Sequence, residues 1–487
     1  FIPGVEEFHA TTCFECSGGC GLLARKIDGR LVKVEGNPTH PISQGGSCAR
    51  GQALPQAMYH PDRLRSPLVR EGARGDGHWT EVSWDDALDR LAAELAPLRA
   101  DGAGLAFLTG QLRGHRRELV RRFAAAFGGA RHWVHEPFGD ATVRRAHELV
   151  AGIDAFPAHD LEHANYVVTF GAALVEASRS PVRFGRGLGH LRRGRPGQRG
   201  KLVAIGPHLS VTAAHADEWL PARPGTDAML ALSLAHVLIR DDRYDRAFVD
   251  ERTEGFGAFR DRVLAAFAPE TVAATTGVSA DQIERVAREM AQHGPTIAIA
   301  GDAAVTGPSG LATAVAVTHL NALMGAFGRK GGIYFDLVPP FTPYPALEEP
   351  SELEEPRPLA DVLADASVGA RALLVAGTNP FFTLPAASGV ADLFSNIPFV
   401  ASFGSFADET SREADLILPE PTAFERFDDD VPAPGVGTSM ASLSGPVFVR
   451  PLHDTRAMPD VLLQVGQRLG DDMAAALPWE SYETALR

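Results

Sequence analysis

Four cysteines constrain this chain more than any other feature of its sequence. The 487 residues contain only four, and their spacing is Cys13-x2-Cys16-x3-Cys20-x27-Cys48. Three lie close together and the fourth stands apart, unlike the scattered cysteines of a disulfide framework. Short, unequal intervals allow three thiolates to bind three corners of an iron–sulfur cubane while the distant cysteine binds the fourth. The spacing therefore favours a [4Fe–4S] cluster.

Structural zinc is the main alternative for these cysteines. Zinc sites are usually built from two matched pairs of closely spaced ligands, and Cys48 has no second cysteine near it. Gly18, Gly19 and Gly21 leave the backbone around the first three cysteines free to bend and to direct N–H groups at sulfide. Zinc is therefore the less favoured alternative, and disulfides are less favoured still.

Length and charge limit the class of protein. A chain of 487 residues is too long for one ordinary core, so we expect two or three packed domains. The formal net charge of −15 is opposite to the basic surface that duplex nucleic acid requires, so no nucleic-acid partner is expected. The sequence contains no run of about 18 apolar residues, so it predicts no membrane span. Arginines gather within residues 179–199, as a solvated basic loop or as a site for a small anion.

Two patterns divide the chain. In the first 66 residues, the short alternating segments 22–27 and 31–34 are joined by Asp28-Gly29, a dipeptide typical of a hairpin. After Ser83, which predicts a helix start, apolar runs ending at glycine or a turn alternate with helical patterns, as in parallel sheets covered on both faces. The runs are 105–110, 166–171, 202–207, 296–301, 373–377 and 416–419, and examples of the helical patterns are 228–239 and 281–292.

The loops after these runs are candidate ligand-binding loops, because parallel sheets bind ligands beyond the carboxyl ends of their strands. They contain Gly171, Gly206-Pro207, Gly301-Asp302 and Gly377-Thr378-Asn379-Pro380. Residues 339–358, rich in Pro and Glu, are expected to form an exposed connection between domains.

Several ordered motifs support a family resemblance. They are the cysteine segment 11–22, the segments 34–38 and 48–51, Gly206-Pro207, 223–227, 321–325, 328–332, 377–380 and 414–419. Together they resemble the molybdopterin oxidoreductases, the large subunits of the dimethyl sulfoxide reductase, formate dehydrogenase and polysulfide reductase type. The resemblance covers nearly the whole chain, and beyond the cysteines its strength lies in the ordered set.

The resemblance implies an α/β fold with a small β-rich iron–sulfur domain and two α/β domains whose sheets are mostly parallel. These would hold molybdopterin guanine dinucleotide with Mo or W. The expected domains are 1–66 for the cluster, 67–135 with 336–424, and 136–335 for the dinucleotide. Residues 425–487 would return to the cluster domain and begin the connection to the family's C-terminal β-rich domain, which we expect this chain to lack.

The resemblance also assigns roles to residues. Cys13, Cys16, Cys20 and Cys48 would bind the cluster, and Arg50 would be an electron-transfer bridge to the pterin. The cofactor-binding residues would be Gly171, Gly206, Pro207, Gly225, Thr226, Asp227, Gly301, Gly377 and Asn379, with Asp227 accepting hydrogen bonds from guanine. The family holds its metal through Cys, selenocysteine, Ser or Asp. No cysteine remains for this in the matching window 136–142, so Asp140 is the candidate, with Glu136 as a second option.

Two functional hypotheses stay open. Residues 425–430 and 454–456 are similar to the polysulfide reductase branch and to the molybdenum-free large subunits of alternative complex III and menaquinone reductase. The chain is thus a Mo or W oxidoreductase acting on a small anionic or sulfur substrate, which the intact dinucleotide motifs favour, or a molybdenum-free electron-transfer or scaffold subunit. Either implies an iron–sulfur partner subunit, a membrane anchor, indirect contact with the quinone pool and a periplasmic or extracytoplasmic location.

Overall fold

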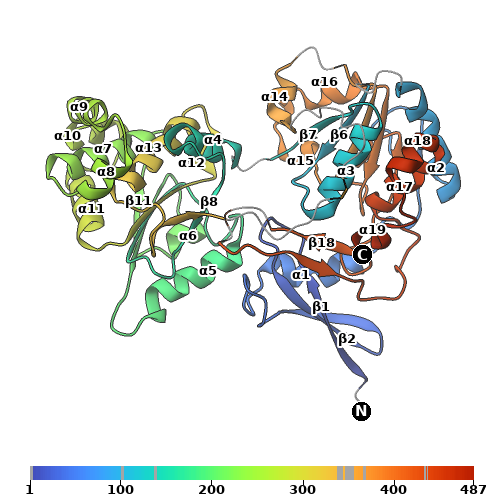
Figure 1. Ribbon diagram of the computed structural model, residues 1–487, viewed down its shortest axis with the longest axis horizontal. Helices are drawn as coiled ribbons and strands as arrows, with labels where there is room; N and C mark the ends of the chain where they lie inside the picture. Colours follow the sequence, from blue (N-terminus) through green and yellow to red (C-terminus); the bar gives the residue numbers. More distant parts are fainter. Residues whose placement is uncertain are drawn as a thin grey trace.

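The computed structural model describes residues 4–99, 104–136, 140–336, 344–345, 356–365, 369–432, 435 and 437–487. Figure 1 shows two large lobes side by side, with the small N-terminal domain next to the ends of both. No helix in these described ranges is both long and apolar enough to cross a bilayer. Most of the expected connection at 339–358 lies outside the described residues.

The N-terminal domain is a three-stranded antiparallel sheet with one helix. Its strands are β1 (Glu6–Thr12), β2 (Gly21–Ile27) and β3 (Arg30–Gly36), and its helix is α1 (Ala49–Met58). Asp28 and Gly29 both have positive φ, 50° and 77°, as the predicted two-residue hairpin turn requires. The cysteine loop therefore connects β1 to β2 at the end opposite the hairpin turn.

The largest sheet has eight strands in the order β14-β7-β6-β15-β16-β17-β4-β5. The strands are β4 (Leu68–Glu71), β5 (His78–Glu81), β6 (Leu105–Thr109), β7 (Arg131–Val134), β14 (Arg357–Pro358), β15 (Ala372–Ala376), β16 (Phe399–Phe403) and β17 (Leu416–Ile417). Its pairings are parallel except those made by β4. One face packs on α2 (Trp84–Leu95), α3 (Gly114–Ala126) and α17 (Met458–Arg468), and the other on α14 (Leu359–Leu363) and α16 (Val390–Ser395).

The second lobe contains a parallel four-stranded sheet in the order β11-β10-β9-β12. The strands are β9 (Tyr166–Phe170), β10 (Lys201–Gly206), β11 (Glu218–Pro221) and β12 (Thr296–Ala300). One face is covered by α7 (Asp227–Arg240), α10 (Pro269–Thr276), α11 (Ala280–Gln292) and α13 (Gly310–Leu323), and the other by α5 (Pro181–Gly189). Further elements here are α4 (Asp140–Ala151), α6 (Val211–Ala214), α8 (Arg246–Arg252), α9 (Phe256–Ala266), α12 (Ala303–Thr306), and the pair β8 (Pro157–His159) and β13 (Ile333–Phe335).

These sheets confirm the predicted α/β class. Each of the six apolar runs forms a strand, and the pairings among those strands are parallel. The Ser83 side chain accepts a hydrogen bond from the Asp86 backbone N at 3.2 Å, so it caps α2 as its sequence position predicts.

The C-terminal segment divides between two partners. Its first part forms the antiparallel pair β18 (Asp428–Asp430) and β19 (Ser442–Ser444), and β19 contacts β1 of the cluster domain. Its second part, α17, α18 (Asp471–Ala476) and α19 (Tyr482–Leu486), packs on the large sheet instead. Met458, Val461 and Leu462 enter that core because their helical spacing places them on one face. The first part thus lies beside the cluster domain, and the second part packs on the large sheet.

Candidate redox site

The four cysteines line one small cavity in the N-terminal domain. The Cys13 backbone N donates to the Cys20 carbonyl at 2.8 Å, which closes the loop between β1 and β2. Cys48 occupies the N-cap position of α1 and approaches from the other side. All four are free thiols. In the described ranges, no three or more His, Cys, Asp or Glu side chains form a group that could bind a single metal ion.

Burial controls the chemistry of these thiols. It raises the pKa of both Cys13 and Cys20 to about 12, so each keeps its proton until iron displaces it. Pro181 and Val182, at the start of α5, close the cavity from the second lobe. A shared cavity enclosed by four free thiols fits a cluster in which each sulfur binds a different iron.

A central cavity of about 420 Å³ lies where the three parts of the molecule meet. Cys16 and Arg50 line it from the cluster domain, and loops beyond the carboxyl ends of β6, β12 and β15 line it from the two large sheets. This is the position at which parallel sheets bind ligands. It brings together six of the predicted site residues, namely Cys16, Arg50, Asp140, Gly301, Gly377 and Asn379.

Arg50 lies between the cysteines and this cavity. It is the second residue of α1 and follows Cys48 by two positions. Its Nη2 is buried and has no hydrogen-bond partner among the described residues. A buried guanidinium nitrogen without an acceptor costs free energy unless a bound group supplies one. This unpaired donor fits an anionic or carbonyl-bearing cofactor in the cavity.

The candidate metal ligand Asp140 is already ion-paired. It opens α4 and pairs with the guanidinium of Arg179, whose Nη2 also lies 3.5 Å from Glu136 Oε1. Arg179 is 7% exposed and stacks over the Phe156 ring at 4.2 Å, so this residue of the expected basic loop is buried. Burial, with a hydrogen bond to Asp140, raises the pKa of Glu136 to about 8. Residues 137–139 lie outside the described ranges.

Asp302 adds a further carboxyl group to the cavity. It follows β12 with a φ of 44°, a conformation that few residues other than glycine adopt, and its Oδ2 accepts from the Ala173 N at 2.7 Å. Burial raises its pKa to about 6. The sequence analysis predicted this loop as a candidate ligand-binding loop but assigned no role to the Asp302 carboxyl group.

The remaining predicted dinucleotide residues fall in two places. Gly171, Gly206 and Pro207 line a small second cavity beyond the ends of β9 and β10. Gly171 has a φ of 62°, and a Cβ there would lie 2.8 Å from the Ala304 N, so the close approach requires glycine. Gly301 also lines the central cavity, which the loops of β12 and β15 share.

The segment before α7 lines neither cavity. Thr226 Oγ1 donates to the Arg223 carbonyl at 2.7 Å, while Gly225 turns the chain with a φ of 76°. The Asp227 carboxyl group is buried, which raises its pKa. Asn379, which lines the central cavity, also makes a side-chain hydrogen bond within the protein: its amide donates to Glu409 Oε2 at 2.7 Å.

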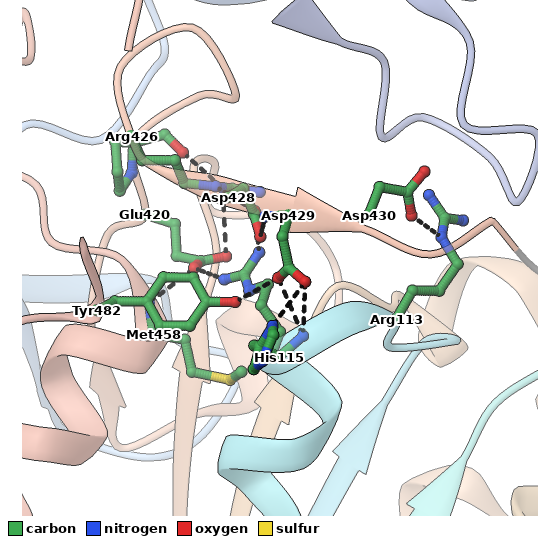
Figure 2. Close-up of polar contacts among 11 residues, drawn as sticks. Arg113, His115, Glu420, Arg426, Asp428, Asp429, Asp430, Met458 and Tyr482 are labelled. Carbon is green, nitrogen blue, oxygen red and sulfur yellow. Dashed lines mark hydrogen bonds and ion pairs between the residues drawn. The ribbon is translucent and has the colours of Figure 1, made fainter. Parts of the chain in front are cut away.

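Arg113 is a residue that the sequence analysis missed. It follows β6, lines the central cavity and donates to the Cys16 carbonyl at 2.9 Å and to Asp430 Oδ1 at 2.6 Å. Figure 2 shows Asp430 at one end of the acidic strand β18, facing Arg113. The one signal in the sequence is the position of Arg113 in a loop after a predicted parallel strand.

Comparison with known families agrees with this geometry. Residues 6–60 match the model of the molybdopterin oxidoreductase Fe4S4 domain, and residues 63–443 match that of the molybdopterin oxidoreductases. The chain belongs to the molybdopterin oxidoreductase family, as its motifs predict. The matches support a [4Fe–4S] cluster and a molybdopterin as its cofactors.

Similar proteins include subunits of two named reductases. The menaquinone reductase molybdopterin-binding-like subunit of Nitratidesulfovibrio vulgaris is 33% identical over 100% of this chain and 68% of its own length. The thiosulfate reductase molybdopterin-containing subunit PhsA of Salmonella typhimurium is 27% identical over 99% of this chain and 66% of its own. The chain thus spans about two thirds of these relatives. The structure of acetylene hydratase from Pelobacter acetylenicus has the same fold, with a TM-score of 0.79 at 21% identity, over 97% of this chain and 70% of that one.

Proposed function

We propose that this chain is the iron–sulfur redox subunit of a membrane-associated, quinone-linked oxidoreductase complex. In this proposal the central cavity binds molybdopterin guanine dinucleotide with Mo or W and receives a small anionic or sulfur substrate. The names of the menaquinone reductase and thiosulfate reductase subunits support the substrate class and the quinone link. The partners would be an iron–sulfur electron-transfer subunit and a membrane anchor on the periplasmic face.

One observation carries the proposal. Cys16 and Arg50 line the same cavity as Gly301 and Gly377, which follow parallel strands of the two different lobes. The cavity therefore adjoins the cluster on one side and two ligand-binding loops on the other, so an electron would cross a short, enclosed path. When bound, the molybdopterin supplies two-electron chemistry that no side chain performs.

The chain's own residues would bind the cofactor within this cavity and orient it. Arg50 offers its unpaired Nη2 to a pterin group and places a positive charge beside the cluster. Burial and the hydrogen bond to Asp140 raise the pKa of Glu136, which favours its protonated form beside that carboxylate. Gly301, Gly377 and Asn379 would hold the dinucleotide from this cavity. Gly171, Gly206 and Pro207 would hold it from the second cavity, and Gly225, Thr226 and Asp227 from outside both cavities.

A specific contact favours a second candidate function. Asp140 is paired with Arg179, and a carboxylate neutralised by a buried guanidinium is a poor ligand for a metal cation. In the second candidate the chain keeps the cluster but holds no molybdenum or tungsten, and it serves as an electron-transfer or scaffold subunit of the same kind of complex.

Elemental analysis of the purified complex tests both. We expect at least about four iron atoms per chain in either case, because the partner iron–sulfur subunit would add iron of its own. About one Mo or W per chain supports the first candidate, and iron without either metal supports the second. Extraction of the pterin as its fluorescent oxidation product shows whether the cavity is loaded independently of the metal.

A variant that tests the cluster assignment is Cys48→Ser. It removes one proposed cluster ligand and leaves the residues of the central cavity unchanged. We expect it to lower both the iron content and the visible absorption near 400 nm, relative to the wild-type complex. Wild-type protein without iron, or iron content that is unchanged in this variant, contradicts the proposal.

A further inference from the structure

Arg113 brings a positive charge from the large-sheet domain to the cysteine loop. Its Nη1 donates to the Cys16 carbonyl at 2.9 Å, and its Nε donates to Asp430 Oδ1 at 2.6 Å. The Arg113 side chain is 11% exposed and that of Asp430 is 1% exposed. In Figure 2 this pair lies apart from the contacts that Glu420 and Tyr482 make further along β18.

Asp430 contacts the other arm of the same loop. A Cβ placed on Gly19 would collide with Asp430 Oδ2, an atom with no hydrogen-bond partner in the described part of the chain. Gly19 leads directly into Cys20. The ion pair therefore lies across the cluster loop, with its positive group at Cys16 and its negative group beside the turn before Cys20.

The backbone also fixes the position of Arg113. It is the N-cap of α3, and the next residue, Gly114, has a φ of 57° and packs directly against Asp429. A buried turn of this kind restricts where the Arg113 side chain can point. The guanidinium therefore stays at the cluster loop without a bound cofactor.

We propose that Arg113, held by Asp430, is a positioning residue for electron transfer that raises the reduction potential of the [4Fe–4S] cluster. With Arg50, it places two guanidinium groups in the wall between the cluster and the central cavity, where the carboxyl group of Glu15 also lines both cavities. The inference rests on the cluster alone, and not on the presence of Mo or W or on the substrate. The step is the uptake of one electron by the cluster, with no bond made or broken and no proton transferred.

The sign of the effect follows from charge. Reduction adds one negative charge to the cluster, so a nearby cation stabilises the reduced form and a nearby anion destabilises it. Screening is weak here because both side chains are nearly excluded from water. Arg113 and Asp430 should therefore shift the potential in opposite directions, Arg113 from its contact with the Cys16 carbonyl and Asp430 from its place beside the turn before Cys20.

An EPR-monitored redox titration of the full chain in its complex, with dithionite as reductant, tests this. We expect Arg113→Gln to make cluster reduction at least tenfold less favourable, a lowering of about 59 mV for a one-electron couple. Asp430→Asn should raise the potential. Arg113→Lys keeps the charge and should stay within about half of the Arg113→Gln shift. The control is Arg121→Gln, which removes an exposed arginine from the same helix and should change nothing.

A purely structural pair predicts a different pattern. The proposal is overturned if Arg113→Gln leaves the potential unchanged, or if Asp430→Asn lowers it in the same direction. If Arg113→Gln fails to retain its cluster, Arg113→Lys and Asp430→Asn decide. If Arg113→Lys stays within about 30 mV of the wild-type potential, half of the expected shift of about 59 mV, and Asp430→Asn has a raised potential, the proposal is supported. Any other pair of values contradicts it. Failure of the proposed function would show itself separately, as wild-type protein that lacks iron.

Discussion

Arg63 and Glu425 form an ion pair that is closed off from water. Both side chains are 0% exposed. Arg63 Nη1 also donates to the Met58 carbonyl at 3.1 Å, and Glu425 accepts from the backbone N of Thr422 and of Leu452, both at 2.8 Å. These extra hydrogen bonds offset the cost of removing two charges from water. The pair thereby joins the end of the cluster domain to the returning C-terminal segment.

Replacing Glu425 with Gln should destabilise the protein strongly. The substitution keeps the shape but leaves the Arg63 charge buried and unpaired, which costs about 3–5 kcal/mol in comparable buried pairs. Chemical denaturation of wild type and variant at pH 7 measures this loss. Glu480→Gln, at an exposed carboxylate in the same C-terminal segment, is the control and should be neutral. An equal, small effect of both substitutions would show that the buried pair adds no stability.

The same pair fixes a pH dependence. Burial alone would raise the pKa of Glu425, but hydrogen bonds from Arg63, Leu452 and Thr422 outweigh it and hold the pKa below its ordinary value of 4.5. A depressed folded pKa stabilises the native state above pH 4.5, and this stabilisation is lost as the pH falls through the folded pKa. The difference between wild type and Glu425→Gln should therefore shrink below about pH 4.5.

At the scale of elements, β18 connects two helices through one carboxylate. Asp429 accepts from the His115 N at 2.9 Å, at the start of α3, and from the hydroxyl of Tyr482 in α19 at 3.0 Å. Figure 2 shows both contacts converging on Asp429. The strand thus acts as a cap for α3 and as an anchor for the last helix.

Removal of the Asp429 carboxylate should destabilise the protein more than removal of the Tyr482 hydroxyl. Asp429→Ala leaves the buried Tyr482 hydroxyl and the His115 N–H without their acceptor, so we expect a loss of about 3 kcal/mol or more. Tyr482→Phe loses one hydrogen bond and should cost about 1 kcal/mol. The double variant should be no less stable than Asp429→Ala alone, because the hydroxyl has no acceptor there. Fully additive losses from denaturation curves would contradict this coupling.

Local patterns explain which elements the sequence could predict. The six apolar runs, the Asp28-Gly29 turn and the Ser83 cap are specified by neighbouring residues, and each occurs in the structure. The strand β18 could not be predicted, because Asp-Asp-Asp is a poor strand former in isolation. Its acids are satisfied by residues as far away as His115, which is 314 positions distant in the chain.

The same distinction applies to the site at the scale of the whole molecule. The short spacing of Cys13, Cys16 and Cys20 is a local motif, so the sequence alone identified these residues as candidates; in the structure they line one cavity together with Cys48. The pairing of Arg179 with Asp140 and that of Arg113 with Cys16 join separate parts of the fold. Such contacts depend on how the domains pack, and no local motif records them.

Removal of iron should loosen one part of the molecule and spare the rest. The core of the cluster domain is small, includes Cys13 and Cys20, and is completed by Val182, Phe424 and Val447 from outside the domain. So small a core is marginal without a covalent or metal link. The two large sheets instead have extensive cores of their own. Loss of the cluster should therefore open the N-terminal domain while both lobes stay folded.

Hydrogen exchange measured by mass spectrometry checks this on protein whose iron has been removed by chelation, and on Cys48→Ser. We expect β1, β2, β3 and α1 to exchange at least about tenfold faster, because their opening no longer requires the release of a bound cluster. Peptides from α7, α11 and α13 should keep their protection, since these helices pack within the second lobe. Unchanged exchange in the N-terminal strands would mean that the cluster does not stabilise its domain. Equal loss of protection in α13 would mean that the whole chain unfolds as one unit.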